Sequence, residues 1–182
     1  MEYKVIRSAR RTLALQVTPD GLVVRAPYLT PTSAIESFVE SHADWARRQT
    51  EKLREREREA EKYPPITKRD VVRLTEEARR VIPERVRYFA DMVGVKPAGI
   101  TIRHQRTRWG SCSSKGNLSF NCLLMLTPPE VIDSVVAHEV CHLRFMNHSE
   151  SFYTELFGVC PNYEACGEWL KTYGRILLLR SE

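Results

Sequence analysis

Short alternation of apolar and polar residues opens the chain and indicates β-strands. Residues 3–7 and 12–17 alternate in this way, and the PDG sequence at 19–21 predicts a turn that leads into a third segment, LVVRA at 22–26. We interpret the three segments as a short antiparallel meander.

Helical periodicity follows. Apolar residues recur every three or four positions from Thr30 onward, and the pattern continues into a charge-rich stretch, 54–62, before the YPP sequence at 63–65 ends it. A second long helix is predicted over about 70–93. Pro83 lies inside it and predicts a bend or a break, because proline cannot donate the helical hydrogen bond.

The second half begins with two further predicted strands, 99–106 and 117–126, joined by the loop TRWGSCSSKG. The mixture of strands and helices predicts an α+β fold in which a small antiparallel sheet packs on several helices. We expect one domain, 1–182. Within it the meander and the two long helices, 1–95, support a catalytic half, 96–182.

Helix-start signals divide the sequence after these strands. Thr127 is the expected N-cap of a helix that runs to about Phe145. Asn147 and Glu150 have the spacing of a capping box, which places His148 on the first turn of the next helix.

The first of these helices carries the clearest chemical motif in the chain. His138, Glu139 and His142 fit the pattern HExxH. Residues four apart lie on one face of a helix, so both imidazoles can bind one metal ion. Glu139 lies about 100° around the helix from His138, where a general base for a zinc-bound water belongs. Chance occurrence of HExxH is expected in roughly one chain in a hundred or fewer.

A zinc hydrolase site normally has a third protein ligand and one open position. His148 is the favoured third ligand because of its residue type and the short loop that precedes it. Glu155, Glu164 and Glu168 are alternatives, since many two-histidine zinc hydrolases use a later glutamate.

Charge is unevenly distributed along the chain. The net charge is +5, and residues 92–129 contain no Asp or Glu. The positive residues of that segment equal the whole excess: Lys96, Arg103, Arg106, Arg108 and Lys115. One interpretation is a basic surface with no partner. The other is a partner that carries phosphate or carboxylate groups, including a nucleic acid bound through 96–115.

Other features exclude several classes of protein. No apolar run is long enough to span a membrane, and the N-terminus lacks the apolar region of a secretory signal. Five cysteines, without a CxxC pair, argue against a disulfide framework and a ribbon-type zinc site. A cytoplasmic location is the expectation.

The sequence also resembles a known family. HEVCHLRFMNHSESFY, preceded by RWGSCSSKGNLSFNCLLMLTPPEVIDSVVA, is similar to the YgjP-like metallopeptidases, which are zincin-type proteins related to the SprT and Spartan proteases. RRTLALQVTPDGLVVRAP resembles the opening segment of the same family, so the resemblance spans nearly the whole chain. The cysteine cluster of some SprT-type relatives is missing, so cleavage of DNA–protein crosslinks is not implied.

The resemblance implies one Zn²⁺ per chain, bound by His138, His142 and His148, with Glu139 as the base. It also implies that the strand near 117–122 runs beside the metal-binding helix, where it could hold an extended substrate by β-addition. The RWGSC segment is expected near that cleft. Candidate substrate-binding residues are therefore Arg108, Trp109 and Asn121.

Together these features predict a zincin-like, zinc-dependent metallohydrolase, a peptidase that acts on protein or peptide through a zinc-bound water. Arg108 and Arg144 are candidates to stabilise the oxyanion. Two other classes stay open. One is a metal-containing module that binds nucleic acid or a partner with weak or no hydrolysis, and the other is a hydrolase of small amides or phosphoesters.

Overall fold

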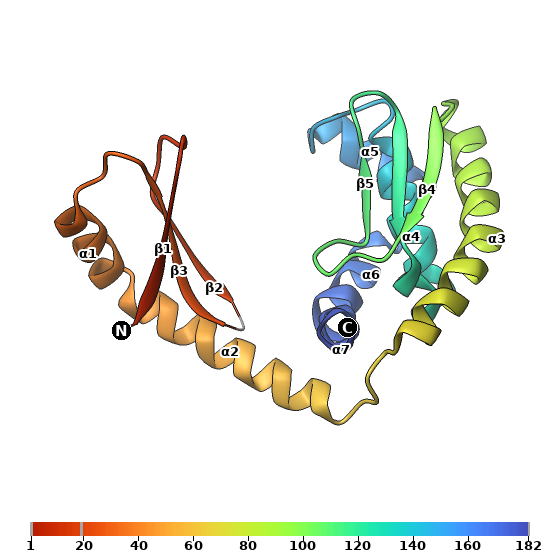
Figure 1. Ribbon diagram of the computed structural model, residues 1–182. Coiled ribbons are helices and arrows are strands. Elements are labelled where there is room, and N and C mark those ends of the chain that lie inside the picture. Colours follow the sequence, from red (N-terminus) through yellow and green to blue (C-terminus); the bar gives the residue numbers. More distant parts are fainter. Residues whose placement is uncertain (1, 19, 182) are drawn as a thin grey trace. The chain divides into compact units, whose positions relative to one another are not determined.

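The computed structural model describes residues 2–18 and 20–181, so Pro19 of the predicted turn lies outside the described residues. The chain forms two compact units, Met1–Glu59 and Ala60–Glu182 (Figure 1). Each unit has its own hydrophobic core. The expectation of a single domain over 1–182 stays a prediction.

The first unit is a mixed three-stranded sheet with helices. Its elements are β1 (Tyr3–Ser8), β2 (Ala14–Thr18), β3 (Gly21–Pro27), α1 (Thr32–Ser41) and nearly all of α2 (Ala43–Glu61). The strand order is β1-β3-β2, with β1 parallel and β2 antiparallel to β3. The predicted antiparallel meander is therefore wrong, because alternation indicates strands but does not say which strands pair.

Alternate residues of β3 face the core of this unit. That core contains Leu22, Val24, Ala26, Ile35, Val39 and Ala46. The helix predicted from Thr30 is divided in two at His42, whose Nδ1 is hydrogen-bonded to the carbonyl oxygen of Phe38 at 2.8 Å.

The second unit contains another mixed sheet. Its strands are β4 (Gly99–Arg103), β5 (Gly110–Cys112) and β6 (Asn117–Asn121), in the order β4-β6-β5. β4 runs parallel and β5 antiparallel to β6, which corrects the expectation of an antiparallel sheet. β5 lies inside the segment that was predicted to be a loop.

Both predicted strands of this half end earlier than expected. The side chain of Asn121 accepts a hydrogen bond from the backbone N–H of Leu123, and the chain turns there into the 3-10 helix η1 (Cys122–Leu126). A short polar side chain that bonds to the backbone two residues later competes with the strand ladder in this way.

Helix α3 (Lys68–Val93) covers the core face of this sheet. Thr67 and Asp70 form a capping box at its start, and Gly94 ends it in the left-handed conformation. Pro83 does not interrupt it, contrary to the predicted break. Our prediction placed this helix in the N-terminal part, 1–95. Its buried residues instead pack in the core of the second unit: Leu74, Ala78, Ile82, Val86 and Phe89.

The remaining helices are α4 (Pro129–Cys141), α5 (Glu150–Val159), α6 (Tyr163–Trp169), the π-helical segment η2 (Leu170–Gly174) and α7 (Arg175–Arg180). The strands and helices together confirm the α+β prediction. Among the described residues, no helix is long and apolar enough to cross a membrane.

Three ends of helices α4 and α5 differ from prediction. α4 ends at Cys141 rather than near Phe145, and His142 is its C-cap. α5 is capped by Ser149, whose hydroxyl accepts from the N–H of Phe152, so His148 precedes the cap instead of lying on the first turn. Pro128 occupies the N-cap position of α4, while Thr127 bonds back to Leu124.

Candidate metal centre

Three imidazoles converge at the end of α4. His138 and His142 lie one turn apart, and His148 reaches them from the segment before α5. The Nε2 of His138 lies 3.1 Å from that of His142 and 3.2 Å from that of His148. All of the candidate ligand nitrogens lie within 4.8 Å of one another.

These distances suit one tetrahedral metal ion. Two nitrogens bound at about 2.0–2.1 Å with a tetrahedral angle between them lie about 3.3 Å apart. The two separations of 3.1 and 3.2 Å are close to that value. The donor set therefore fits a small divalent ion with imidazole preference.

Hydrogen bonds on the far side of the rings orient two of the ligands. The Nδ1 of His142 lies 2.9 Å from the carbonyl oxygen of Phe145. A carbonyl can only accept, so Nδ1 carries the proton and the lone pair of Nε2 points into the cluster. The Nδ1 of His138 lies 3.0 Å from the hydroxyl of Tyr163.

The protonation states also favour metal binding. Burial is the main cause that lowers the pKa of His138 to about 4, and the neighbouring His142 and His148 add to the effect. Burial likewise lowers the pKa of His142. A metal binds the neutral form of imidazole, so these shifts keep two ligands ready near neutral pH.

The apolar ring of Phe152 contacts all three imidazole rings. Its ring centroid lies 5.1 Å from that of His138, 4.6 Å from His142 and 4.9 Å from His148. The side chain is fully buried. Sequence reasoning missed both Phe152 and Tyr163; only the four-residue spacing from His148 to Phe152 could have suggested the former.

Glu139 lies against the edge strand β5. A Cβ atom added to Gly110 would come within 2.6 Å of the Cγ and Oε1 atoms of Glu139, so only glycine allows this approach. Glu139 is buried, and burial raises the pKa of its carboxyl to about 7, partly offset by the positive charge of Arg108.

The strand beside α4 is thus β5 rather than the strand at 117–122. β6 is the middle strand and is paired on both sides, by β4 and by β5. Within the described residues of this sheet, β5 has an unpaired edge next to the metal-binding helix. Addition of a substrate strand therefore requires β5.

The three candidate substrate-binding residues lie in different environments. Arg108 is exposed and close enough to Glu139 to affect its pKa. Trp109 packs against Gly174 of η2, where an added Cβ would lie 3.0 Å from the indole. Asn121 is fully buried, and its amide donates to the carbonyl oxygens of Gln105 and Arg108 at 2.6 and 3.0 Å. Its side chain positions the loop that carries Arg108.

The alternative third ligands do not join the histidines. Glu155 is paired with Arg144 at 2.9 Å, and Glu168 is paired with Lys171. Glu164 is exposed on α6. Arg144 also donates to the carbonyl oxygen of Val93, so its guanidinium is already engaged and does not suit an oxyanion role.

Comparison with known proteins gives one family match. The family model described as "YgjP-like, metallopeptidase domain" matches residues 11–73 and 68–173. No curated protein matches the chain.

Two solved structures show weak similarity. One is the metallopeptidase zymogen abylysin of Pyrococcus abyssi, with 19% identity and a TM-score of 0.47 over 52% of this chain and 97% of that chain. The other is the zymogen jannalysin of Methanocaldococcus jannaschii, with 21% identity and a TM-score of 0.41 over 46% and 90%. Similarity at this level adds nothing to the family match.

Proposed function

The chain belongs to the YgjP-like metallopeptidase family, and from this premise we propose that it is a zinc-dependent peptidase whose centre is built by His138, His142 and His148. The observation that carries the proposal is the convergence of three imidazoles directly beside a buried glutamate and an open strand edge. An HExxH helix next to an edge strand is the zincin-like arrangement.

Zinc is the proposed ion, one per chain. Imidazole ligands suit zinc, and three protein ligands with an open position are typical of its catalytic sites. A zinc ion held there would act as a Lewis acid and lower the pKa of water to about 7.

Glu139 is the proposed general base. It follows the first ligand on α4, and its carboxylate lies against Gly110 of β5. It would take a proton from the attacking water and pass it to the leaving amine. Arg108, exposed beside it, is the proposed group that stabilises the developing negative charge on the substrate.

The proposed substrate is an extended protein or peptide segment. Its backbone would pair with the free edge of β5, which brings a peptide bond to Glu139 and to the histidine cluster. Trp109 precedes β5 and packs against Gly174, and Asn121 would hold the preceding loop.

The first test is the zinc content of the wild type and of His148→Ala, measured by native mass spectrometry with elemental analysis. We expect one zinc in the wild type and a sharp loss in the variant. His42→Ala is the matched control, because His42 lies in the first unit and contacts its own helix. Absence of zinc from the repleted wild type would overturn the metal assignment.

The second test separates a peptidase from a binding module. Glu139→Gln should retain zinc and lose peptide hydrolysis by roughly 10²–10⁴-fold, the usual worth of a general base. Full hydrolysis in this variant would reject the mechanism. A small-molecule phosphoesterase with two metals is less well supported, because the described residues provide one such cluster of ligands.

The location proposed for the protein is the cytoplasm. All five cysteines are free, which suits a reducing compartment. Fractionation of cells that produce the tagged protein would test this assignment.

A further inference from the structure

The sheet of the second unit has a polar face that the peptidase proposal does not use. In the register of the three strands, Thr101 is the partner of Ser119, and Ser119 is the partner of Ser111. Three hydroxyl side chains therefore form a row across the sheet. The intervening residues, including Ile102 and Phe120, pack in the core on the other side.

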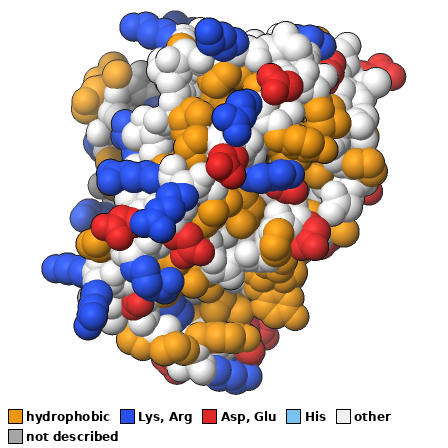
Figure 2. All heavy atoms as spheres, turned by 90° about the vertical axis from the view of Figure 1, so that its right-hand side faces the viewer, with side chains coloured by type: hydrophobic (Ala, Val, Ile, Leu, Met, Phe, Trp, Pro, Cys, Tyr) orange, Lys and Arg blue, Asp and Glu red, His pale blue; other side chains and the backbone are white. Residues whose placement is uncertain are grey.

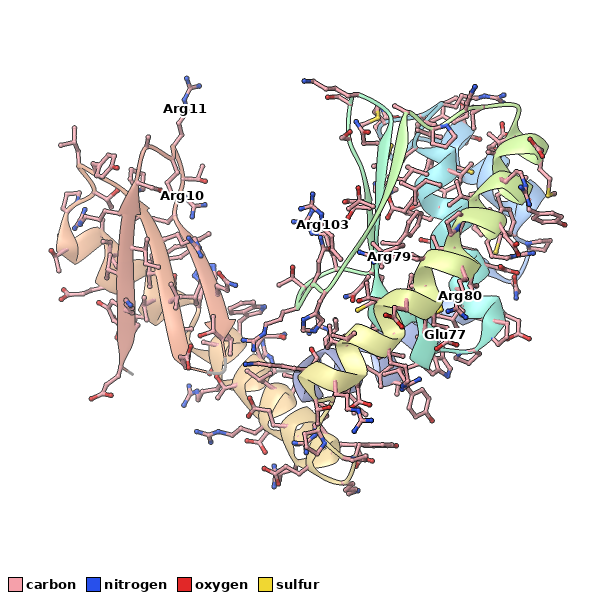
Figure 3. All side chains as sticks on the ribbon, turned by 45° about the vertical axis from the view of Figure 1, so that its right-hand side comes forward. Arg10, Arg11, Glu77, Arg79, Arg80 and Arg103 are labelled. Atoms are coloured by element: carbon pink, nitrogen blue, oxygen red, sulfur yellow. The ribbon has the colours of Figure 1, made fainter. Side chains whose placement is uncertain are left out.

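Arginines surround this row. Arg103 lies two residues after Thr101 and is exposed on the same face. Figure 3 shows it projecting from the sheet on the side away from α3. The loop after β4 adds Arg106 and Arg108, also exposed. None of the three arginines forms an ion pair with any residue that the structure describes.

The face is hollowed. A cavity of about 750 Å³ is lined by the hydroxyl row, the three arginines and neighbouring polar groups, which include Gln105, Ser113 and Asn117. No described residue in its lining is acidic. We call this surface the arginine face.

Two polar atoms of the arginine face lack partners within the protein. The Oγ of Ser119 and the Oε1 of Gln105 are buried, and neither has a hydrogen-bond partner among the described residues. Buried polar groups are nearly always satisfied. Of the two, the Ser119 hydroxyl can donate a hydrogen bond to an anionic oxygen, whereas the Oε1 of Gln105 can only accept one.

Helix α3 provides a contrast. In Figure 2, which views the molecule from the side of α3, Lys and Arg are interspersed with Asp and Glu. Arg73, for example, lies 3.8 Å from Asp70 and 3.7 Å from Glu77. Mixed charge of this kind is typical of a solvated surface, whereas the arginine face has one sign only.

We propose that the arginine face binds the phosphate backbone of a nucleic acid. Arginine, serine, threonine and asparagine side chains are those that commonly contact phosphate oxygens. Trp109, the aromatic residue of the adjoining loop, packs inward against Gly174, so the face offers no stacking platform for bases. Contacts to phosphate oxygens carry no information about the bases, so binding is expected to be independent of base sequence. This inference does not depend on the peptidase activity.

Of the five positive residues in the acid-free segment, three line the cavity of the arginine face: Arg103, Arg106 and Arg108. Lys96 and Lys115 do not line the cavity. Arg108 adjoins both the arginine face and Glu139, so a bound nucleic acid would lie next to the proposed peptide cleft.

The test is fluorescence anisotropy of labelled 20-mers, single-stranded and duplex, titrated with the full-length protein over a range of salt concentrations. Three phosphate contacts predict a slope of log K against log salt of about −2 to −3. In Arg103→Glu/Arg106→Glu, affinity should fall at least roughly tenfold and the slope should become shallower by about 2. Arg108 is left intact because it adjoins Glu139.

Arg79→Glu/Arg80→Glu is the matched control. Both residues are exposed on α3, as Figure 3 shows, and this variant makes the same change in net charge. Its affinity should stay within about twofold of the wild type, because long-range charge effects are weak at physiological salt. An equal loss in both variants would overturn the assignment to the arginine face.

The same titration distinguishes the arginine face from the metal centre and from a surface that binds acidic proteins. Binding should persist with EDTA and in Glu139→Gln, since neither change touches the arginines. Equal binding of a poly-glutamate peptide would instead identify an acidic-protein surface, and no binding at low salt would reject the proposal. If the Glu variant fails to fold, as judged by circular dichroism, Arg103→Gln/Arg106→Gln gives the same test with a smaller expected loss.

Discussion

The two sheets of this protein have the same strand topology and different chemistry. In each, the first strand is parallel and the second antiparallel to the third, which occupies the middle: β1-β3-β2 and β4-β6-β5. The first sheet packs on α1 and α2 through small aliphatic residues. The second packs on α3 and α4, and α4 carries the histidines.

The edge strands show the difference most clearly. β2 contains no glycine, whereas β5 begins with Gly110, which lies against Glu139. The strands' surroundings differ in charge as well. The hollow along the first sheet includes Glu2, Lys4 and Asp20, while the arginine face has no acidic lining among the residues described. Strand topology thus supplies a scaffold, and the covering helix and single residues on the edge strand supply the chemistry.

Shortening one buried side chain in each middle strand should show whether the two hydrophobic cores are independent. Phe120 of β6 is fully buried in the core that also contains residues of α4, so Phe120→Ala should lower the free energy of unfolding by about 3–5 kcal/mol and release the metal. Val24→Ala in β3 should destabilise the first unit and leave zinc content unchanged. Hydrogen exchange measures the stability of each unit, and elemental analysis measures the zinc content. Zinc loss in Val24→Ala would show that the cores are coupled.

Replacement of Gly110 in β5 should reduce peptide hydrolysis without reducing zinc binding. Gly110→Ala would place a methyl group 2.6 Å from Glu139 atoms, so strand or carboxylate must move. A displacement of about 1 Å can cost on the order of 10² in rate, and we expect such a loss of peptide hydrolysis with zinc retained.

Gly158→Ala is the control for this change, because an added Cβ there meets no atom within 4 Å. Activity should be unchanged, and stability should rise by up to about 1 kcal/mol, since alanine favours helix over glycine. Wild-type activity in Gly110→Ala would show that the contact with Glu139 is dispensable.

Removal of the Tyr163 hydroxyl tests whether the hydrogen bond to His138 contributes to metal binding. The described residues of the first sheet contain no such metal cluster. Tyr163→Phe removes the partner of the Nδ1 of His138 and should weaken zinc affinity by about 10–100-fold. Competition with a chromophoric chelator measures this. Tyr173→Phe, exposed on η2, should leave affinity unchanged; a similar loss there would point to a general effect on the helix.

The smallest expected effects concern ion pairs. Arg85 of α3 makes two hydrogen bonds with Asp133 of α4, at 2.6 and 2.8 Å, and the side chains are 34% and 30% exposed. Asp133→Asn should cost roughly 1–2 kcal/mol in urea unfolding, between the values for exposed and buried pairs.

The matching pair of the first unit is Asp44 with Arg47, with side chains 76% and 70% exposed. Asp44→Asn should change stability by no more than about 0.5 kcal/mol. Equal effects of the two substitutions would mean that the bridge between α3 and α4 contributes no more than a surface pair.

Local spacing in the sequence determined much of the proposed metal site. His138 and His142 are one helical turn apart, and Glu139 is fixed by the same backbone, so their relation follows from helix geometry alone. His148 was predictable for a similar reason, because a short loop limits how far it can lie from His142. Helix and strand types were largely predictable from periodicity, with errors at their ends.

Only the tertiary structure decided which segments meet. The pairing of β5 with β6, the contact of Gly110 with Glu139, and the bond of Tyr163 to His138 join residues that no periodic pattern relates. Asn121, a candidate for substrate contact, is instead buried, where it holds the loop that carries Arg108. Such contacts depend on how whole elements pack, and packing energy is summed over many residues rather than encoded in any short stretch.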